Sequence, residues 1–384
     1  MDSNHVTFAS TSRSQDLTKG GREAVELAHR HDCRYRREMK SRMFIGLVFL
    51  ALLQAAYGQN YKLLKSIPIG GEGGWDYLSI DSTARKLYVT HASKIVIVDL
   101  AQDKVVGDIA DTPGVHGFAI APELGHGFSS NGTESRVSVV DLKTLKTIAK
   151  IETGENPDAI LYEPARSEVY AFNGRGKSAT VIDAKIDKVI ATVPLSGKPE
   201  FAAADTKSGR VFCNIEDKNE VAVIDAKAHS VIASWPLAPG EEPTGMAFDE
   251  AHHRLFVGCH NKMMSMLDSD TGKIIATVPI GAGVDACAFD DATQLVFASC
   301  GDGTLTIAKE ETPDKLTIVQ TLTTEGGART MALDSKTQRV YTCTAQIAPG
   351  PASPSLPAVG ERRRPSYVPG TFHLLVYETA KTPR

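Results

Sequence analysis

The sequence lacks a convincing helical period, and it lacks the short motifs that mark common cofactor sites. It contains no Cys-x-x-Cys-His haem attachment, no cysteine–histidine zinc cluster, no P-loop and no dinucleotide-binding fingerprint. These absences remove any motif-based argument for a c-type haem protein, a zinc-finger protein or a nucleotide-dependent enzyme. What remains is a set of short β-rich runs separated by turn residues.

Cysteine is scarce, and its count does not suit a disulfide framework. Five cysteines lie beyond residue 58, namely Cys213, Cys259, Cys287, Cys300 and Cys343. An odd number leaves at least one thiol free, and the positions follow the strand repeats. We expect these residues to be buried as small apolar side chains.

Long apolar runs are absent, apart from a short one near the amino terminus. Residues 43–58 are apolar and follow a basic stretch, but the apolar core of about ten residues is too short to cross a bilayer. We interpret residues 39–58 as a Sec-type signal peptide and residues 1–38 as upstream sequence or an unstructured extension. An uncleaved anchor is the alternative. The mature chain would be exported to the periplasm or the extracellular space, without a membrane span.

Basic side chains are fewer than acidic side chains beyond residue 58. Residues 59–384 carry 33 basic and 40 acidic side chains, which gives a net charge of −7 with histidine neutral. Binding to a phosphate backbone needs a positive surface, so this charge disfavours nucleic acid as a partner. The local exception is the run Arg362-Arg363-Arg364. The 326 residues fit one domain.

The sequence does have a unit of about 42 residues that recurs seven times. Each copy has an acidic or turn residue, a short polar turn and an aromatic strand, as in Asp81-Ser-Thr-Ala-Arg-Lys-Leu-Tyr-Val. The copies start at Asp81, Ala121, Glu163, Asp205, Asp249, Asp290 and Asp334, at intervals of 40 to 44 residues. A fixed period of this length is typical of a repeat architecture.

Each repeat contains four short strands. In the third copy they are predicted at residues 158–162, 168–172, 179–183 and 188–194. Four antiparallel strands in 40–45 residues describe one propeller blade, and blades must stack to bury both of their faces. We therefore predict an all-β fold, a seven-bladed β-propeller of four-stranded antiparallel blades, spanning residues 59–384 as a single domain.

The two ends of the repeat region predict how the ring closes. The last copy has only three strands, at residues 330–334, 339–343 and 372–377, whereas residues 61–70 match the fourth-strand pattern. The N-terminal strand is therefore predicted to complete the seventh blade, which leaves no unpaired edge at the junction.

Several motifs inside the strands recur with the repeat. They are Lys86-Leu-Tyr-Val-Thr-His91, Tyr170-Ala-Phe-Asn173, the Val-Ile-Asp endings of third strands and the Val-Ile-Ala-Thr-Val-Pro runs of fourth strands. With these motifs the chain resembles the YVTN-type β-propeller repeat family over roughly residues 61–378. The resemblance implies the fold and leaves the function open, because such propellers serve in binding and in catalysis. His91 stands where the family motif closes with Asn.

Aligning the repeats predicts which residues surround one end of the central channel, here called the channel mouth. The first set lies five residues before each repeat start and comprises Asp76, His116, Asp158, Glu200, Thr244, Asp285 and Arg329. A second set lies ten residues after each start and includes His91, Asn131 and Asn173. A tight hairpin would pair Asp76 with His91, His116 with Asn131, and Asp158 with Asn173. These residues, Thr244 excepted, are the predicted ligand-binding set.

Carboxylates that converge on one axis repel one another unless they are protonated, paired with Arg329 or neutralised by a cation. Oxygen ligands from Asp158, Asn173, Glu200 and Asp285 would suit a divalent cation such as calcium. The mouth histidines would suit a transition metal or proton transfer. The alternative is a ring of solvated charge that closes the strand ends without any ligand.

Two further features lie outside this set. A proline-rich loop at residues 345–370 carries Arg362, Arg363, Arg364 and Tyr367, and its ends are predicted to lie at the channel mouth. A loop of this length tends to be functional or disordered. We interpret it as a lid or partner-docking loop, or else as a mobile loop without a function. His252 and His253 fall on a turn at the opposite end of the channel and are expected to be exposed.

Three functions follow from these patterns. We favour an exported, non-catalytic, monomeric propeller that binds an unidentified protein or small molecule at the channel mouth. The alternative is a metal-assisted, lactonase-like hydrolase, similar in fold to propeller lactonases, with Glu200, Asp158 and His116 as catalytic candidates. The third is binding of single-stranded nucleic acid through the loop residues Arg362–Arg364 and Tyr367.

Overall fold

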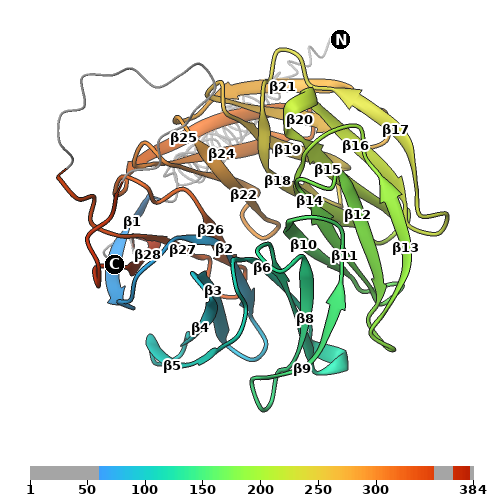
Figure 1. Ribbon diagram of the computed structural model, residues 1–384. Helices are drawn as coiled ribbons and strands as arrows, with labels where there is room; N and C mark the ends of the chain where they lie inside the picture. Colours follow the sequence, from blue (N-terminus) through green and yellow to red (C-terminus); the bar gives the residue numbers. More distant parts are fainter. Residues whose placement is uncertain (1–59, 350–365, 381–384) are drawn as a thin grey trace, which may run out of the picture. The chain divides into compact units, whose positions relative to one another are not determined.

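The computed structural model describes residues 60–349 and 366–380. Its strands form seven four-stranded antiparallel sheets in a ring, which confirms the predicted seven-bladed β-propeller (Figure 1). These residues belong to one compact unit, Asn60–Arg384. In the ranges described, no helix is long and apolar enough to span a membrane. The interpretations of residues 1–38 and 39–58 concern parts of the chain outside those ranges.

Six blades take their strands in chain order. Blades 1 to 3 consist of β2 (Trp75–Asp81), β3 (Lys86–His91), β4 (Lys94–Asp99) and β5 (Lys104–Ile109); β6 (Val115–Ala121), β7 (His126–Asn131), β8 (Arg136–Asp141) and β9 (Lys146–Glu152); and β10 (Pro157–Glu163), β11 (Glu168–Asn173), β12 (Ser178–Asp183) and β13 (Lys188–Pro194). Blades 4 to 6 consist of β14 (Pro199–Asp205), β15 (Arg210–Ile215), β16 (Glu220–Asp225) and β17 (Ser230–Pro236); β18 (Pro243–Asp249), β19 (Arg254–Cys259), β20 (Met263–Asp268) and β21 (Ile274–Pro279); and β22 (Val284–Asp290), β23 (Leu295–Cys300), β24 (Thr304–Thr312) and β25 (Lys315–Thr323). The first strands of neighbouring blades pack against one another and line the channel.

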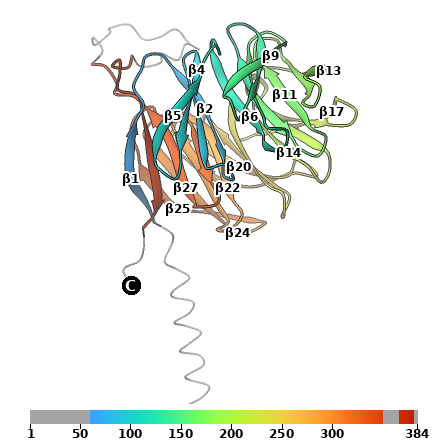
Figure 2. The ribbon, with the colours of Figure 1, turned by 90° about the horizontal axis from the view of Figure 1, so that it is seen from below.

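The seventh blade joins the two ends of the repeat region. It contains β26 (Met331–Asp334), β27 (Arg339–Thr344), β28 (His373–Thr379) and β1 (Tyr61–Pro68). Two short 3₁₀ helices, η1 (Pro122–Leu124) and η2 (Glu216–Lys218), occur in turns. The predicted closure is therefore confirmed, and Figure 2 shows β1 beside the carboxy-terminal strand.

The recurrent aspartates explain why the hairpins form where they do. Asp81 Oδ1 accepts hydrogen bonds from the backbone N–H groups of Thr83 (2.9 Å) and Ala84 (2.7 Å). The last turn residue, Arg85, has a φ of 56°. At the end of a third strand, Asp99 Oδ1 likewise accepts the N–H of the residue two positions on, at 2.8 Å. A short acidic side chain that binds its own turn is the physical basis of the repeat signature.

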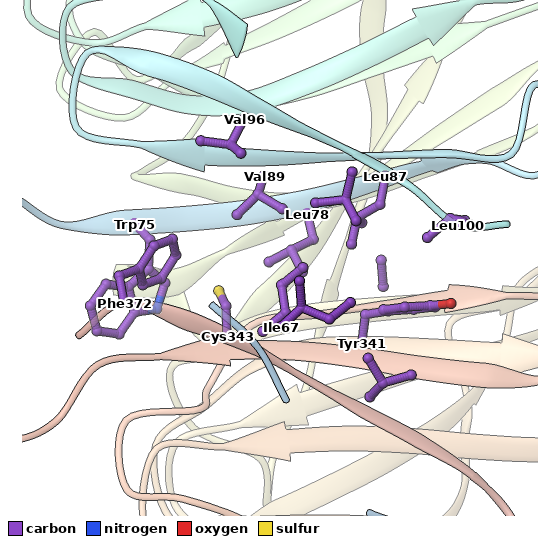
Figure 3. Packing of buried hydrophobic residues seen from close by; sticks show 14 of the residues in the cluster. Ile67, Trp75, Leu78, Leu87, Val89, Val96, Leu100, Tyr341, Cys343 and Phe372 are labelled. Carbon is purple, nitrogen blue, oxygen red and sulfur yellow. The ribbon is translucent and has the colours of Figure 1, made fainter. Parts of the chain in front are cut away.

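Apolar side chains from adjacent blades form the core. Between blades 7 and 1, Ile67 lies in a buried cluster that includes Trp75, Tyr341 and Phe372 (Figure 3). The Trp75 and Phe372 rings stack with their centroids 5.0 Å apart. Each fully buried side chain of this size contributes about 1.5–3 kcal/mol relative to exposure. Because this cluster contains residues from both ends of the repeat region, it stabilises the closed ring.

The cysteines behave as the sequence predicts. All five within the described ranges are free and buried, which confirms their role as small apolar side chains. Cys343, for example, belongs to the cluster between blades 7 and 1. Burial raises the pKa of its thiol to about 12, so it stays protonated and unreactive at neutral pH.

We predict that the seam closed by β1 is energetically essential. Ile67 is 5% exposed in this seam, whereas Leu63 on the same strand is 51% exposed. Ile67→Ala is expected to lower the free energy of unfolding by about 2–4 kcal/mol, and the control Leu63→Ala by no more than about 0.5 kcal/mol. Urea denaturation measures both values. Equal effects of the two substitutions would contradict closure through β1.

Candidate functional site

A β-bulge near the start of each of six first strands sets the geometry of the channel mouth. In blade 1, Trp75 pairs with His91 and Leu78 pairs with Val89, so two residues of β2 face one residue of β3. The same shift occurs in the first strands of blades 2 to 6. A bulge of this kind turns the extra side chain away from the ladder. Asp76, His116, Asp158, Glu200, Thr244 and Asp285 all occupy these irregular positions.

The bulges also show that one detail of the sequence prediction is wrong by one residue. His91 pairs with Trp75 instead of Asp76, and Asn131 pairs with Val115 instead of His116. Asn173 likewise pairs with Pro157 instead of Asp158. A regular hairpin was the basis of the prediction, and the extra residue of each bulge shifts the register.

Hydroxyl groups opposite the bulges bind the backbone groups that the strand ladder leaves unpaired. Thr90 Oγ1 accepts the Asp76 N–H at 3.2 Å and donates to the Tyr77 carbonyl at 3.0 Å. In blade 2, Ser130 Oγ accepts the Gly117 N–H at 2.9 Å and donates to the carbonyl of Asp158 at 2.5 Å. The second bond joins blade 2 to blade 3 and fixes the backbone that carries one of the mouth carboxylates.

Three of the predicted residues converge from three successive blades. His116 Nδ1 lies 2.6 Å from Asp76 Oδ2 and 3.5 Å from Asp158 Oδ1. The ligand atoms of the three side chains lie within 4.8 Å of one another, and each side chain keeps partial access to solvent. Burial raises the pKa of Asp158 to about 6, while His116 acts in the opposite direction. We call Asp76, His116 and Asp158 the mouth triad.

Arg329 pairs with carboxylates on the other side of Asp76. Its Nε donates to Asp285 Oδ2 at 2.8 Å, and one terminal nitrogen lies 3.9 Å from Asp76 Oδ1. The same guanidinium donates to the Trp75 carbonyl at 3.3 Å, so blades 6, 7 and 1 are joined. Burial raises the pKa of Asp285 above its usual range, against the lowering effect of Arg329. The predicted pairing of the acidic ring with Arg329 is thus seen at Asp285.

Glu200 is held by a lysine and by a tyrosine from across the channel. Lys198 Nζ pairs with Glu200 Oε1 and also with Glu216 Oε2, the latter at 2.5 Å. The Tyr77 hydroxyl from blade 1 donates to Glu200 Oε2 at 3.4 Å. Burial and then Asp158 raise the pKa of Glu200 well above its usual value. Burial alone would lower the pKa of Lys198, but the two glutamates raise it above its usual range.

The other predicted ligand residues are buried between strands. His91 stacks on Phe372 with ring centroids 4.3 Å apart, and burial lowers its pKa. Asn131 Nδ2 donates to Ser138 Oγ at 2.8 Å and to Glu134 Oε1 at 2.9 Å. Asn173 Nδ2 similarly donates to Ser178 and Thr180 at 3.0 Å. Of the predicted metal set, only Asp158 belongs to the mouth triad.

Three charged residues of the mouth are not found by the repeat alignment. They are Lys198, Glu216 and His260. Glu216 and His260 lie one residue beyond the predicted second-set positions, directly after the ends of β15 and β19. Lys198 stands two residues before Glu200, and alternation along an extended segment would have been the signal for it.

The described ends of the proline-rich loop lie on the blade 7 and blade 1 seam. Ile347 and Tyr367 form an isolated antiparallel bridge, and the Val368 N–H donates to the Gln346 carbonyl at 2.8 Å. The Tyr367 ring packs on Trp75 with centroids 4.5 Å apart. Since the Trp75 carbonyl binds Arg329, the loop starts beside the mouth. Arg362, Arg363 and Arg364 lie outside the described residues.

Below the mouth, a cavity of about 60 Å³ lies among the first strands of blades 1 to 4, with Tyr77, Phe118 and Phe201 in its lining. One water needs roughly 10–15 Å³ of such space, so the cavity has room for a few waters.

Comparisons with known proteins identify the fold and no family. No protein-family model matches the sequence, and no curated protein matches it. Among solved structures 1817 chains match, so the fold is widespread. One is a chain in a crystal structure of a mitotic checkpoint complex, with a TM-score of 0.65 and 14% identity over 74% of this chain and 90% of that chain. At this identity the likeness shows the fold alone, and function must be argued from the site.

Asp158 supplies a pH-dependent test of the mouth electrostatics. Its raised pKa, about 6, means that the folded protein holds this proton more tightly than the unfolded chain does. The cost to stability is fully present above about pH 6 and disappears as the pH falls toward about 4. We expect Asp158→Asn, in metal-free buffer, to raise the free energy of unfolding by about 1–3 kcal/mol at pH 8. At about pH 4 the variant should match the parent.

Urea denaturation across this pH range makes the measurement. Glu152→Gln is the matched control, because that carboxylate is 84% exposed on a surface pair with Arg136. Glu152→Gln should change the free energy of unfolding by the same small amount at both pH values. A destabilised Asp158→Asn protein at pH 8 would show that the charged carboxylate stabilises the mouth, contrary to this account.

Proposed function

We propose that the protein is an exported, non-catalytic propeller that binds through the channel-mouth face and holds a divalent cation in the mouth triad. The observation that carries the proposal is the convergence of Asp76, His116 and Asp158, with His116 Nδ1 within 3.5 Å of both carboxylates. Carboxylates grouped in a partly buried site are stable when a cation neutralises them. The remaining mouth residues surround this anchor.

The chemistry of the triad favours one class of cation. Two carboxylate oxygens and one imidazole nitrogen form a mixed set, which suits zinc, manganese or another transition metal better than calcium, which takes six to eight oxygens. Three protein ligands would leave coordination positions open toward solvent, where a ligand or partner group could bind. Calcium, expected from the oxygen-rich set in the sequence, becomes the weaker alternative.

The surrounding charges would orient whatever binds at the mouth. Arg329 and Lys198 present cationic groups beside the triad, although each also holds carboxylates. An anionic group that binds a cation in the triad would thus meet flanking positive charge. This arrangement supports recognition of a charged group on a ligand or partner. The strands hold the recognising side chains in a rigid frame.

The family and the location are part of the same proposal. The motifs Lys86–His91 and Tyr170–Asn173 support membership of the YVTN-type propeller family, and the apolar stretch at residues 43–58 supports export. Both fit a mature chain that begins at Gln59 and works as a monomeric binding protein in the periplasm or outside the cell. The partner is a small molecule or protein that presents its charged group to the mouth.

A metal titration tests the binding function. With the purified chain from residue 59, isothermal titration with ZnCl₂ is expected to show binding that Asp158→Asn weakens by roughly tenfold or more, with the loss of one equivalent of tight sites. Glu152→Gln is the control and should keep the parental stoichiometry. CaCl₂ should bind more weakly than ZnCl₂. Identical Zn²⁺ titrations for the parent and Asp158→Asn would contradict the proposal.

A specific contact favours the lactonase-like hydrolase as the second candidate. Asp76 orients the His116 ring at 2.6 Å, as a carboxylate orients a catalytic base, and Asp158 has a pKa of about 6. The two functions separate in one assay with the metal-loaded chain and a panel of lactones. Turnover that disappears in Asp158→Asn would replace the non-catalytic proposal with a hydrolase, whereas the binding propeller should show none.

A further inference from the structure

A second cluster of ligand-type residues lies at the opposite end of the first strands from the mouth. Asp249 ends β18, and the turn that follows carries His252, whose Nδ1 lies 2.6 Å from Asp249 Oδ2. Glu310, on β24 of the next blade, places Oε1 3.7 Å from the same nitrogen. The ligand atoms of the three residues lie within 4.8 Å of one another. From Thr244 to Asp249 the strand spans roughly 17 Å, so this cluster is separate from the mouth.

Glu310 is the unusual member. Its side chain is 1% exposed, and neither carboxylate oxygen accepts a hydrogen bond from a donor in the described part of the chain. A buried carboxylate is normally hydrogen-bonded, paired with a cation or bound to a metal. Burial, followed by the contact with Asp249, raises the pKa of Glu310 to about 7. Asp249 is itself fully buried, so two buried carboxyl groups lie side by side.

The other blades show that the fold does not need a carboxylate here. The backbone N–H of Glu310 donates to the Gln294 carbonyl, and the same bond in other blades identifies the equivalent positions. Four of these positions hold the buried residues Leu100, Ala184, Ala226 and Ser269, and the fifth holds the half-buried Leu142. The fold thus accepts small or apolar side chains at this position, and blade 6 instead buries a carboxylate against a neighbouring carboxylate and histidine.

The first-strand aspartates of other blades have ordinary partners. Asp334 Oδ2 pairs with Arg85 of the neighbouring blade at 2.5 Å, and Asp205 Oδ2 pairs with Arg210 at 3.2 Å. Asp249 Oδ2 is next to His252 and Glu310 instead. Blade 5 has Arg254 at the position of Arg210, but this guanidinium pairs with Asp268 at 3.0 Å. Asp249 Oδ2 therefore lies beside a histidine and a second carboxylate where the other two aspartates bind a guanidinium.

We propose that Asp249, His252 and Glu310 form a divalent transition-metal site that links blade 5 to blade 6 on the face opposite the mouth. One oxygen from each carboxylate and Nδ1 of the neutral imidazole would be the ligands, with solvent completing the coordination. His252 is 40% exposed, so the site has an open side through which an ion enters. The bound ion would place positive charge directly on Glu310, whose cationic neighbours His252 and Arg254 make no hydrogen bond to it among the described residues.

The distances suit such an ion. Ligand atoms placed about 2.1 Å from a tetrahedral zinc lie about 3.4 Å from one another. The His252–Glu310 separation of 3.7 Å is close to that value, and the His252–Asp249 separation of 2.6 Å must open by somewhat under 1 Å. Rotation of the exposed imidazole supplies this change, while Asp249 Oδ1 keeps its hydrogen bond from the Ala251 N–H at 2.9 Å.

Zn²⁺ binding to a chain whose mouth triad is inactivated tests the proposal. In the Asp158→Asn background, isothermal titration with ZnCl₂ and thermal denaturation with and without Zn²⁺ are expected to show one bound ion and a raised Tm. His252→Ala should weaken binding by roughly tenfold or more. The matched control is His253→Ala, because that neighbouring histidine is also exposed and pairs with Asp270 at 3.1 Å. It should leave the affinity unchanged.

Glu310→Ala gives a second readout, and its folding is supported by the alanines at the equivalent positions 184 and 226. It is expected to raise the metal-free Tm and to abolish the Zn²⁺-dependent rise. The visible absorption of bound Co²⁺ should be lost in the same variant.

Two outcomes would overturn the proposal. One is an Asp158→Asn chain that binds no Zn²⁺, the result expected if Asp249 and Glu310 share a proton instead of binding an ion. The other is Zn²⁺ binding that neither His252→Ala nor Glu310→Ala changes. Failure of the mouth triad to bind metal would not affect either result.

Discussion

The pairing of β1 with β28 is the interaction on which the rest of this structure depends. Each blade buries its faces only against its neighbours, so a gap at any junction exposes two cores at once. Tyr61 to Pro68 pair with β28 along the strand, with one irregularity at Leu64, and the Tyr61 hydroxyl donates a hydrogen bond to the Gln338 carbonyl at 3.0 Å. Closure therefore holds seven first strands around one axis, which is the condition for any site at the mouth.

Within that closed ring, bulges decide which side chains form the mouth. Each bulge turns one residue out of the ladder, and the ring places these residues from successive blades side by side. Ion pairs such as Arg329 with Asp285 then join blades that hydrogen-bonded ladders do not connect. Burial, and to a smaller extent the neighbouring Asp76, raises the pKa of Asp158 to about 6, so holding this carboxylate charged at the mouth has a cost to stability. Binding of a cation would offset that cost.

The fold was predictable because its signals are local and repeated seven times. An aspartate such as Asp81 both starts the visible repeat and binds the turn that follows it, so sequence and structure share one cause. The mouth was only partly predictable. The repeat alignment finds Asp76, His116 and Asp158, but a bulge inserts a residue without leaving a turn signal, so the cross-strand partners shifted by one. The burial of Glu310 depends on packing between blades, which no local pattern reveals.

The most direct test of the account is the location of a bound ion at the mouth. Crystals of the chain from residue 59, soaked with ZnCl₂, should give an anomalous scattering peak between Asp76 Oδ2, His116 Nδ1 and Asp158 Oδ1. Such a peak would establish the triad as a metal site held by three blades. Crystals that diffract well but show no anomalous peak among these three side chains would contradict the proposed binding function.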